Sequence, residues 1–112
     1  MRIVCIERDG RWKAHAERDG THLAVGPEYE GATEPEAVAK LTRWLEWQGE
    51  HAAALDALQQ CQQAYHRVLV GSAFASSNPG EASSALELQK QALHALEVAR
   101  VMLDEVRARK PE

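Results

Sequence analysis

The 112-residue sequence contains only two cysteines and has no apolar run long enough to span a bilayer. Cys5 and Cys61 belong to no spaced metal-binding or redox motif, so we expect two reduced, buried thiols. At the N-terminus, charge interrupts the sequence after the four apolar residues 3–6, a run too short for a signal peptide. The sequence therefore predicts a cytoplasmic protein that does not insert into a membrane.

An excess of basic residues is also absent. The chain has 13 Lys and Arg residues against 17 Asp and Glu residues, which gives a formal net charge of -4. Surfaces that bind nucleic acid concentrate positive charge against the phosphates, and no segment of this sequence does so strongly. A nucleic-acid-binding regulator is therefore an alternative that is not favoured. It would need Arg107, Arg109 and Lys110 to gather at the C-termini of an oligomer.

The motifs that build common catalytic and metal sites are missing as well. No two of the five histidines have the i, i+3 or i+4 spacing that places two metal ligands on one helical face. Ser72 lies outside any Gly-x-Ser-x-Gly nucleophile turn, and no glycine-rich phosphate loop is present. We therefore expect no enzyme activity, no cofactor and no metal. A small hydrolase is a further alternative, and it would require a polar cleft with coupled titratable groups.

The sequence does contain a change of apolar period near residue 33. Residues 3–6, 11–16 and 21–25 alternate or favour β-structure, and Asp-Gly pairs at 9–10 and 19–20 separate them. Asp-Gly suits tight hairpin turns because both residues tolerate positive φ angles. The pattern predicts an antiparallel three-stranded meander.

A long helix is predicted to follow the meander. Residues 33–36, Thr-Glu-Pro-Glu, form a capping box with proline in the first turn, where its missing N–H costs nothing. The next apolar positions lie in one narrow arc: Val38, Leu41, Leu45 and Ala52. We expect this arc to cover the sheet face that carries the small side chains of Ala14 and Ala16.

The apolar arc of this helix then moves by about 150°, so the helix must change its partner near Gly49. The second arc consists of Ala54, Leu55, Leu58, Cys61, Tyr65, Val68 and Leu69. A second helix over about residues 82–108 carries a heptad-like seam: Ala85, Leu88, Ala92, Ala95, Ala99, Met102 and Val106. We therefore predict an α+β fold with a β-β-β-α domain over residues 1–48. Over residues 49–110 we predict an antiparallel helical hairpin that continues the same long helix, with its loop at about 71–81.

The predicted hairpin has more apolar surface than one chain can cover. Beside the seam lies a stripe of four leucines, and two valines lie on the far side: Leu86, Leu93, Leu96, Leu103, Val98 and Val101. We predict a homodimer in which two hairpins form a four-helix bundle; the alternative is that the stripe folds back on the sheet. Tyr65 and Phe74 either join this interface or close the hairpin core. The predicted interface residues are Trp47, Tyr65, Phe74, Leu86, Leu93, Leu96, Val101 and Leu103.

Residues 8–16 and 30–41 resemble the N-terminal part of HicB-like antitoxins, and the similarity extends over roughly residues 2–47. In that family a strand with an aromatic-x-Ala pattern leads through a Gly-x-Thr-x-x-Glu-Ala turn into a helix. The matching positions here are Trp12, Ala14, Gly31, Thr33, Glu36, Ala37 and Leu41. The family's Pro-Gly-Cys-like turn and its frequent C-terminal DNA-binding module are absent. The resemblance implies a partial ribonuclease-H-like fold and a toxin-binding or regulatory role without catalysis.

These patterns together predict a small, non-catalytic interaction or regulatory module, either antitoxin-like or an adaptor. We expect it to self-associate through its helical hairpin, most simply as a dimer. The sheet or the tip of the hairpin would then be available to a protein partner.

Overall fold

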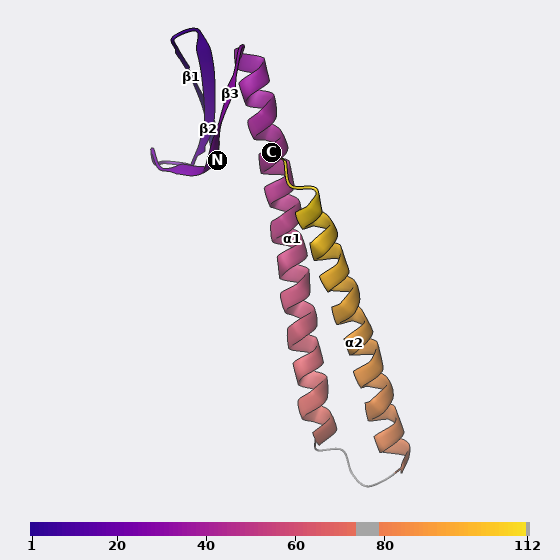
Figure 1. Ribbon diagram of the computed structural model, residues 1–112. Coiled ribbons are helices and arrows are strands. Elements are labelled where there is room, and N and C mark those ends of the chain that lie inside the picture. Colours follow the sequence, from indigo (N-terminus) through magenta and orange to yellow (C-terminus); the bar gives the residue numbers. More distant parts are fainter. Residues whose placement is uncertain (74–78, 112) are drawn as a thin grey trace. The chain divides into compact units, whose positions relative to one another are not determined.

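The computed structural model describes residues 1–73 and 79–111, except for the side chain of Pro79. Three strands precede two helices: β1 (Arg2–Arg8), β2 (Arg11–Glu17), β3 (Ala24–Gly31), α1 (Glu34–Ala73) and α2 (Pro79–Ala108). The strands form one antiparallel sheet in the order β1-β2-β3 (Figure 1). The predicted α+β fold, a meander followed by a long helix and a second helix, is confirmed.

The chain divides into two compact units, and α1 belongs to both of them. The first unit contains residues 1–48, and the second contains Gly49–Lys110. Helix α1 continues through the boundary without interruption. The first unit is therefore the sheet with the beginning of α1, whereas the second is the rest of α1 with α2.

The hairpin between β1 and β2 forms as the sequence predicts. Asp9 and Gly10 both have positive φ angles, 55° and 78°, which fits the tight turn expected of Asp-Gly. The register pairs Arg8 with Arg11 beside the turn and Arg2 with Glu17 at the far end. The two strands are thus paired over their whole length.

The third strand lies later in the sequence than predicted. Residues 21–23 are not in the sheet, and β3 begins at Ala24. The hydroxyl of Thr21 donates to the carbonyl oxygen of Arg18 at 3.1 Å and accepts the N–H of Leu23 at 3.3 Å. These side-chain bonds, together with the backbone bond from the Arg18 N–H to the carbonyl oxygen of Leu23, close residues 18–23 into a wider turn before the strand starts.

Strand β3 also contains a bulge. Ala16 pairs with Val25 and Ala14 pairs with Tyr29. Residues 26–28 of β3 therefore lie opposite the single residue His15 of β2. Gly26, with a φ of 80°, and Pro27 lie in this segment. Proline is tolerated here because β3 is an edge strand and the bulge breaks the ladder of hydrogen bonds.

The core of the first unit lies between the sheet and the first turns of α1. Its side chains with an exposed fraction of 0% are Ala14, Ala16, Ala37 and Leu41. Around them pack the partly buried Cys5, Trp12, Tyr29, Val38 and Leu45. The prediction that a helix covers the small side chains of β2 is therefore confirmed. Ala52 was expected in the same arc, but it is exposed and belongs to the second unit.

The predicted capping box begins helix α1. The N–H of Glu36 donates to the hydroxyl of Thr33 at 3.3 Å, and the carboxylate of Glu36 accepts the N–H of Ala32 at 3.0 Å. The Ala32 N–H and the nearby Lys40 ammonium, 3.4 Å away, lower the pKa of Glu36. The box therefore holds the chain between β3 and α1 in a fixed conformation.

In the second unit, α1 and α2 form an antiparallel hairpin (Figure 1). Glu50, early in this part of α1, lies 3.8 Å from Arg109, which follows the end of α2. The partly buried positions of α1 confirm most of the predicted second arc: Ala54, Leu55, Leu58, Cys61, Tyr65 and Val68. Leu69 is the exception, with an exposed fraction of 39%.

The seam of α2 is rotated from the predicted one. Its buried residues are Leu96, Ala99, Leu103 and Val106, with Ala85, Gln89 and Ala92 partly buried on the same stripe. The prediction placed Leu88, Ala95 and Met102 in the seam, but Leu88 and Met102 are 54% and 57% exposed. The two stripes share Ala85, Ala92, Ala99 and Val106 and differ by one residue at every other position. As a result, Leu88 and Met102 lie on an outer face of the hairpin.

Candidate protein-interaction surfaces

The structure separates the predicted interface residues into three groups. Leu96 and Leu103 are only 4% and 3% exposed, so they are buried within the chain. Their prediction as interface residues is corrected accordingly. The exposed residues are Leu86, Leu93 and Val101, at 52%, 39% and 56%. Trp47 and Tyr65 are partly buried, and Phe74 lies outside the described residues. Leu96 and Leu103 are buried because the seam of α2 is rotated so that both side chains face α1.

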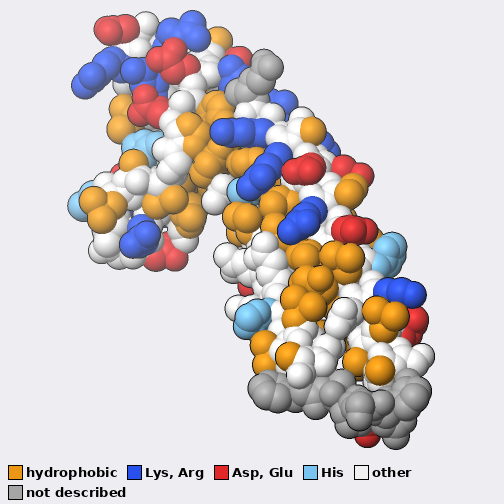
Figure 2. Space-filling model, turned by 60° about the horizontal axis from the view of Figure 1, so that its bottom comes forward, with side chains coloured by type: hydrophobic (Ala, Val, Ile, Leu, Met, Phe, Trp, Pro, Cys, Tyr) orange, Lys and Arg blue, Asp and Glu red, His pale blue; other side chains and the backbone are white. Residues whose placement is uncertain are grey.

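A surface that the prediction missed runs along one side of the hairpin. We call it the alanine face: Ala54, Ala57, Cys61, Ala64 and Val68 on α1, and Leu88, Ala95, Val98 and Met102 on α2. Two open hollows follow it, one of about 310 Å³ between Ala54 and Met102 and one of about 790 Å³ between Val68 and Leu88. Figure 2 shows hydrophobic side chains gathered along the hairpin helices.

The alanine face is left open because two helices bury only the stripe between them. Its residues Ala54, Cys61, Ala64 and Val68 lie at the edge of that stripe and are only partly buried. Among the described residues of α1, the buried ones are Ala37, Leu41 and Trp44, all of which belong to the first unit. No described residue of α1 beyond Gly49 is fully buried. The small side chains on α1 leave a shallow trough, and the larger Leu88, Val98 and Met102 border it on α2, with exposed fractions of 54%, 44% and 57%.

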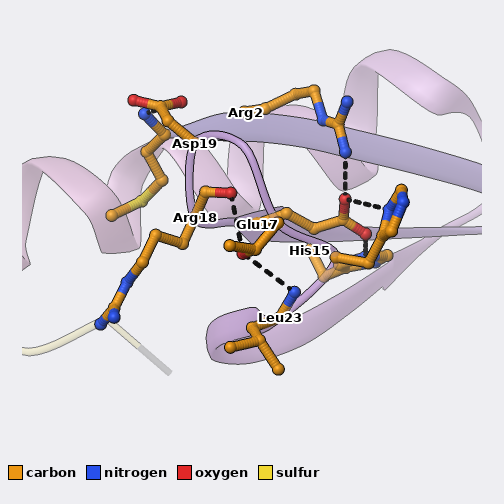
Figure 3. A network of polar contacts seen from close by, with 9 residues as sticks. Arg2, His15, Glu17, Arg18, Asp19 and Leu23 are labelled. Atoms are coloured by element: carbon orange, nitrogen blue, oxygen red, sulfur yellow. Dashed lines mark hydrogen bonds and ion pairs between the residues drawn. The ribbon is translucent and has the colours of Figure 1, made fainter.

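A further site, which is polar, lies on the outer face of the sheet around Glu17 (Figure 3). Its carboxylate accepts a hydrogen bond from the Arg2 guanidinium at 2.6 Å and lies 2.9 Å from Nε2 of His15. Nδ1 of His22 is 3.7 Å away. The hydrogen bonds from His15 and Arg2 lower the pKa of Glu17 to about 2. Glu17 is only 8% exposed, and its carboxylate oxygens contact the polar side chains of Arg2 and His15.

Two bases on the outer sheet face, Arg11 and Lys13, are paired with carboxylates of the same chain. Nζ of Lys13 lies 3.9 Å from Glu28 and 3.5 Å from Glu30, and Nε of Arg11 lies 3.5 Å from Glu30. A phosphate would have to compete with these carboxylates for both bases. Arg11 and Lys13 are therefore less available to a phosphate than unpaired bases would be.

Two searches over the described part of the chain were negative. No group of three or more His, Cys, Asp or Glu side chains is placed to hold a metal ion. No described helix combines the length and apolar character needed to cross a bilayer. Comparisons with protein-family models, curated proteins and solved structures found no significant match to this chain.

Proposed function

We propose that the protein is a small, non-catalytic interaction module that self-associates through its helical hairpin, most simply as a dimer. The uncovered alanine face supports this proposal best. It presents small side chains on one helix and half-exposed Leu88, Val98 and Met102 on the other, at a surface shaped for a further helix. Two such hairpins would form a four-helix bundle.

The apolar side chains supply the driving force for this association. Complete burial of a Leu, Val or Met side chain contributes about 1.5–3 kcal/mol relative to full exposure. Leu88, Val98 and Met102 are about half exposed, so covering each one contributes roughly 1 kcal/mol. In a two-fold dimer each residue contributes twice. The small side chains of α1 allow the backbones of the two helices to come close together, which strengthens the packing between them.

The first unit gives the module a second surface, for which we propose a regulatory protein partner in the cytoplasm. The resemblance of residues 8–16 and 30–41 to HicB-like antitoxins supports an antitoxin-like or adaptor role. β1 and β3 are both edge strands, which offer unpaired backbone groups to an added strand. The pairing of Arg11 and Lys13 with carboxylates favours a protein partner over nucleic acid.

Size-exclusion chromatography with light scattering tests the self-association. The chain has a mass of 12.4 kDa, so a dimer should show about twice this value. The variants M102E and V101E make a matched pair, because the two neighbouring residues are 57% and 56% exposed but only Met102 borders a hollow of the alanine face. M102E should produce the monomer, and V101E should remain dimeric. A wild-type monomer at high concentration would contradict the proposal.

A further inference from the structure

We propose that the occupant of the alanine face is the same face of a second copy, turned end for end, with the two-fold axis level with Cys61 and Ala95. The hairpins then pack α1 against α1 and α2 against α2, and every neighbouring pair of helices is antiparallel. The inference rests on the proposed self-association and adds its geometry. Three independent features of the described residues support it.

The first feature is the apolar pattern of α1, which is symmetric about Cys61. Ala57 precedes Cys61 by nearly the same number of residues as Ala64 follows it, and Ala54 and Val68 are equally distant from it. When two copies of the helix run antiparallel about this point, Ala57 meets Ala64 and Ala54 meets Val68 of the other copy. No two large side chains oppose each other, so the helices can approach closely along this line.

The second feature is a polar flank on the outer side of the same helix. Four polar residues are spaced symmetrically about a midpoint beside Cys61: Asp56, Gln60, Gln63 and Arg67. The last three border hollows on this flank or beside the alanine face. End-for-end packing places Asp56 opposite Arg67 and Gln60 opposite Gln63 of the second copy. Within the described part of the chain, Arg67 makes no ion pair, whereas Asp56 accepts a bond from Gln60 at 2.7 Å. The two copies therefore supply each other with opposite charges at both ends of the contact.

The third feature is the matching symmetry of α2 about Ala95. Leu88 and Met102, at 54% and 57% exposed, are equally distant from Ala95. Leu88 of one copy therefore covers Met102 of the second copy, and Met102 covers its Leu88. Glu81, which borders the larger hollow, and Arg109, which follows α2 and lies 3.8 Å from Glu50 of its own chain, are also equally distant from Ala95 and have opposite charges. The apolar positions of α2 are therefore self-complementary under the same rotation, and the charged residues near its two ends have opposite signs.

The two symmetry points coincide in space. Cys61 and Ala95 line the same hollow of about 310 Å³, together with Ala54 and Met102 farther along it. A single two-fold axis must pass both helices at the same height. The sequence symmetry of α1 places the axis at Cys61, and that of α2 independently places it at Ala95. A parallel arrangement would instead set α1 against α2 of the second copy and would not use either symmetry.

Disulfide cross-linking distinguishes the two arrangements. The C5S variant keeps Cys61 as its only thiol, and oxidation with copper(II)–phenanthroline in air should link two copies, because facing residues at the axis come within disulfide range. The triple variant C5S/C61S/A95C should also form a covalent dimer. The control C5S/C61S/E97C carries its thiol two residues from Ala95, at an exposed position outside both hollows of the alanine face, and should not form a covalent dimer. A parallel dimer would link Cys61 with position 95 in a C5S/A95C variant, and neither single-thiol variant would link.

Charge reversal provides a test without cysteine chemistry. The R67D variant places two carboxylates opposite each other at both ends of the α1 contact, and D56R places two guanidinium groups there. Either single change should raise the dimer dissociation constant about 5- to 30-fold, since two exposed ion pairs are lost. The D56R/R67D double variant restores opposite charges and should return the constant to within about threefold of the wild type.

The outcomes separate this inference from the proposed function. Self-linking at positions 61 and 95 with rescue in D56R/R67D supports the end-for-end dimer. A dimer by mass that shows neither self-linking nor rescue overturns the end-for-end geometry but leaves self-association standing. A monomer by mass at high concentration overturns both.

Discussion

The indole ring of Trp44 lies directly against Gly26, at the bulge in β3. A Cβ atom on Gly26 would lie 2.6 Å from Cζ3 and 3.1 Å from Cζ2 of Trp44, closer than real contacts of this kind. Gly26 also has a φ of 80°, a conformation that residues with a side chain rarely adopt. The bulge in β3 and the position of α1 in the first unit thus depend on one residue without a side chain.

Replacing Gly26 by alanine should therefore destabilise the protein by about 2–5 kcal/mol. The left-handed backbone contributes about 1–2 kcal/mol, and displacement of the Trp44 ring adds about 1–3 kcal/mol of overpacking. Urea denaturation followed by tryptophan fluorescence measures both the free energy of unfolding and the surroundings of the indole. The control is G20A, because Gly20 has a φ of 74° but nothing lies within 4 Å of its added Cβ. Equal losses in G26A and G20A would show that Trp44 does not pack against the bulge.

Local signals allowed much of this fold to be predicted. The Asp9-Gly10 turn and the capping box at Thr33 depend on residues close together in sequence, and both form as expected. The start of β3 was missed because the Thr21 hydroxyl binds the Arg18 carbonyl and the Leu23 N–H. These local side-chain bonds hold residues 21–23 in a turn, although the sequence pattern favours a strand there. The bulge at Gly26 was also missed, since the partner that requires it, Trp44, is far away in sequence.

The candidate surface was only partly predictable for a different reason. The apolar residues of α2 cover more than one side of the helix, so their spacing fits a seam through Leu88 and Met102 as well as one through Leu96 and Leu103. The surface of α1 decides between them, and periodicity within α2 contains no information about it. The Glu17 site was missed as well, because a glutamate beside a turn shows no sequence signal of burial.

The rotated seam predicts opposite consequences for two leucines of α2. Leu103 is 3% exposed, so L103A should reduce the free energy of unfolding by about 2–5 kcal/mol through lost burial and the cavity left behind. Leu88 is 54% exposed, so L88A should change the stability of the isolated chain by less than about 1 kcal/mol and weaken the dimer instead. Urea denaturation at low protein concentration and sedimentation at high concentration measure the two effects. If L88A unfolds the chain while L103A leaves it stable, the seam has the originally predicted orientation.

The Glu17 site predicts a specific loss of stability in acid. Hydrogen bonds from His15 and Arg2 lower the pKa of Glu17 from 4.5 to about 2 in the folded chain. A carboxyl group whose pKa falls on folding stabilises the fold above its unfolded pKa, and this contribution is lost as pH falls through the folded value. The advantage of the wild type over E17Q should therefore be present at pH 5 and should shrink between pH 4.5 and 2.

Chemical denaturation of both proteins across this pH range measures that difference. A second variant, E28Q, serves as the control, because Glu28 is exposed and lies 3.9 Å from Lys13 without any other ion pair among the described residues. Its difference from the wild type should stay small at every pH, as expected for an exposed pair. An E17Q difference that does not change between pH 5 and 2 would mean that the Glu17 carboxylate is not bound by Arg2 and His15 in solution.

Gly49 predicts a gain in stability at the junction of the two units. It lies in the middle of α1, is exposed, and has nothing within 4 Å of an added Cβ. Because glycine costs about 1 kcal/mol relative to alanine inside a helix, G49A should raise the free energy of unfolding by about 0.5–1 kcal/mol. Circular dichroism at 222 nm during thermal unfolding measures the midpoint, which should rise by a few degrees. G71A, near the C-terminal end of the same helix, should raise it less, since the last turns of a helix fray. A lower midpoint for G49A would show that the backbone at this position leaves the helical conformation in solution, and that the two units are joined by a hinge instead of by a continuous α1.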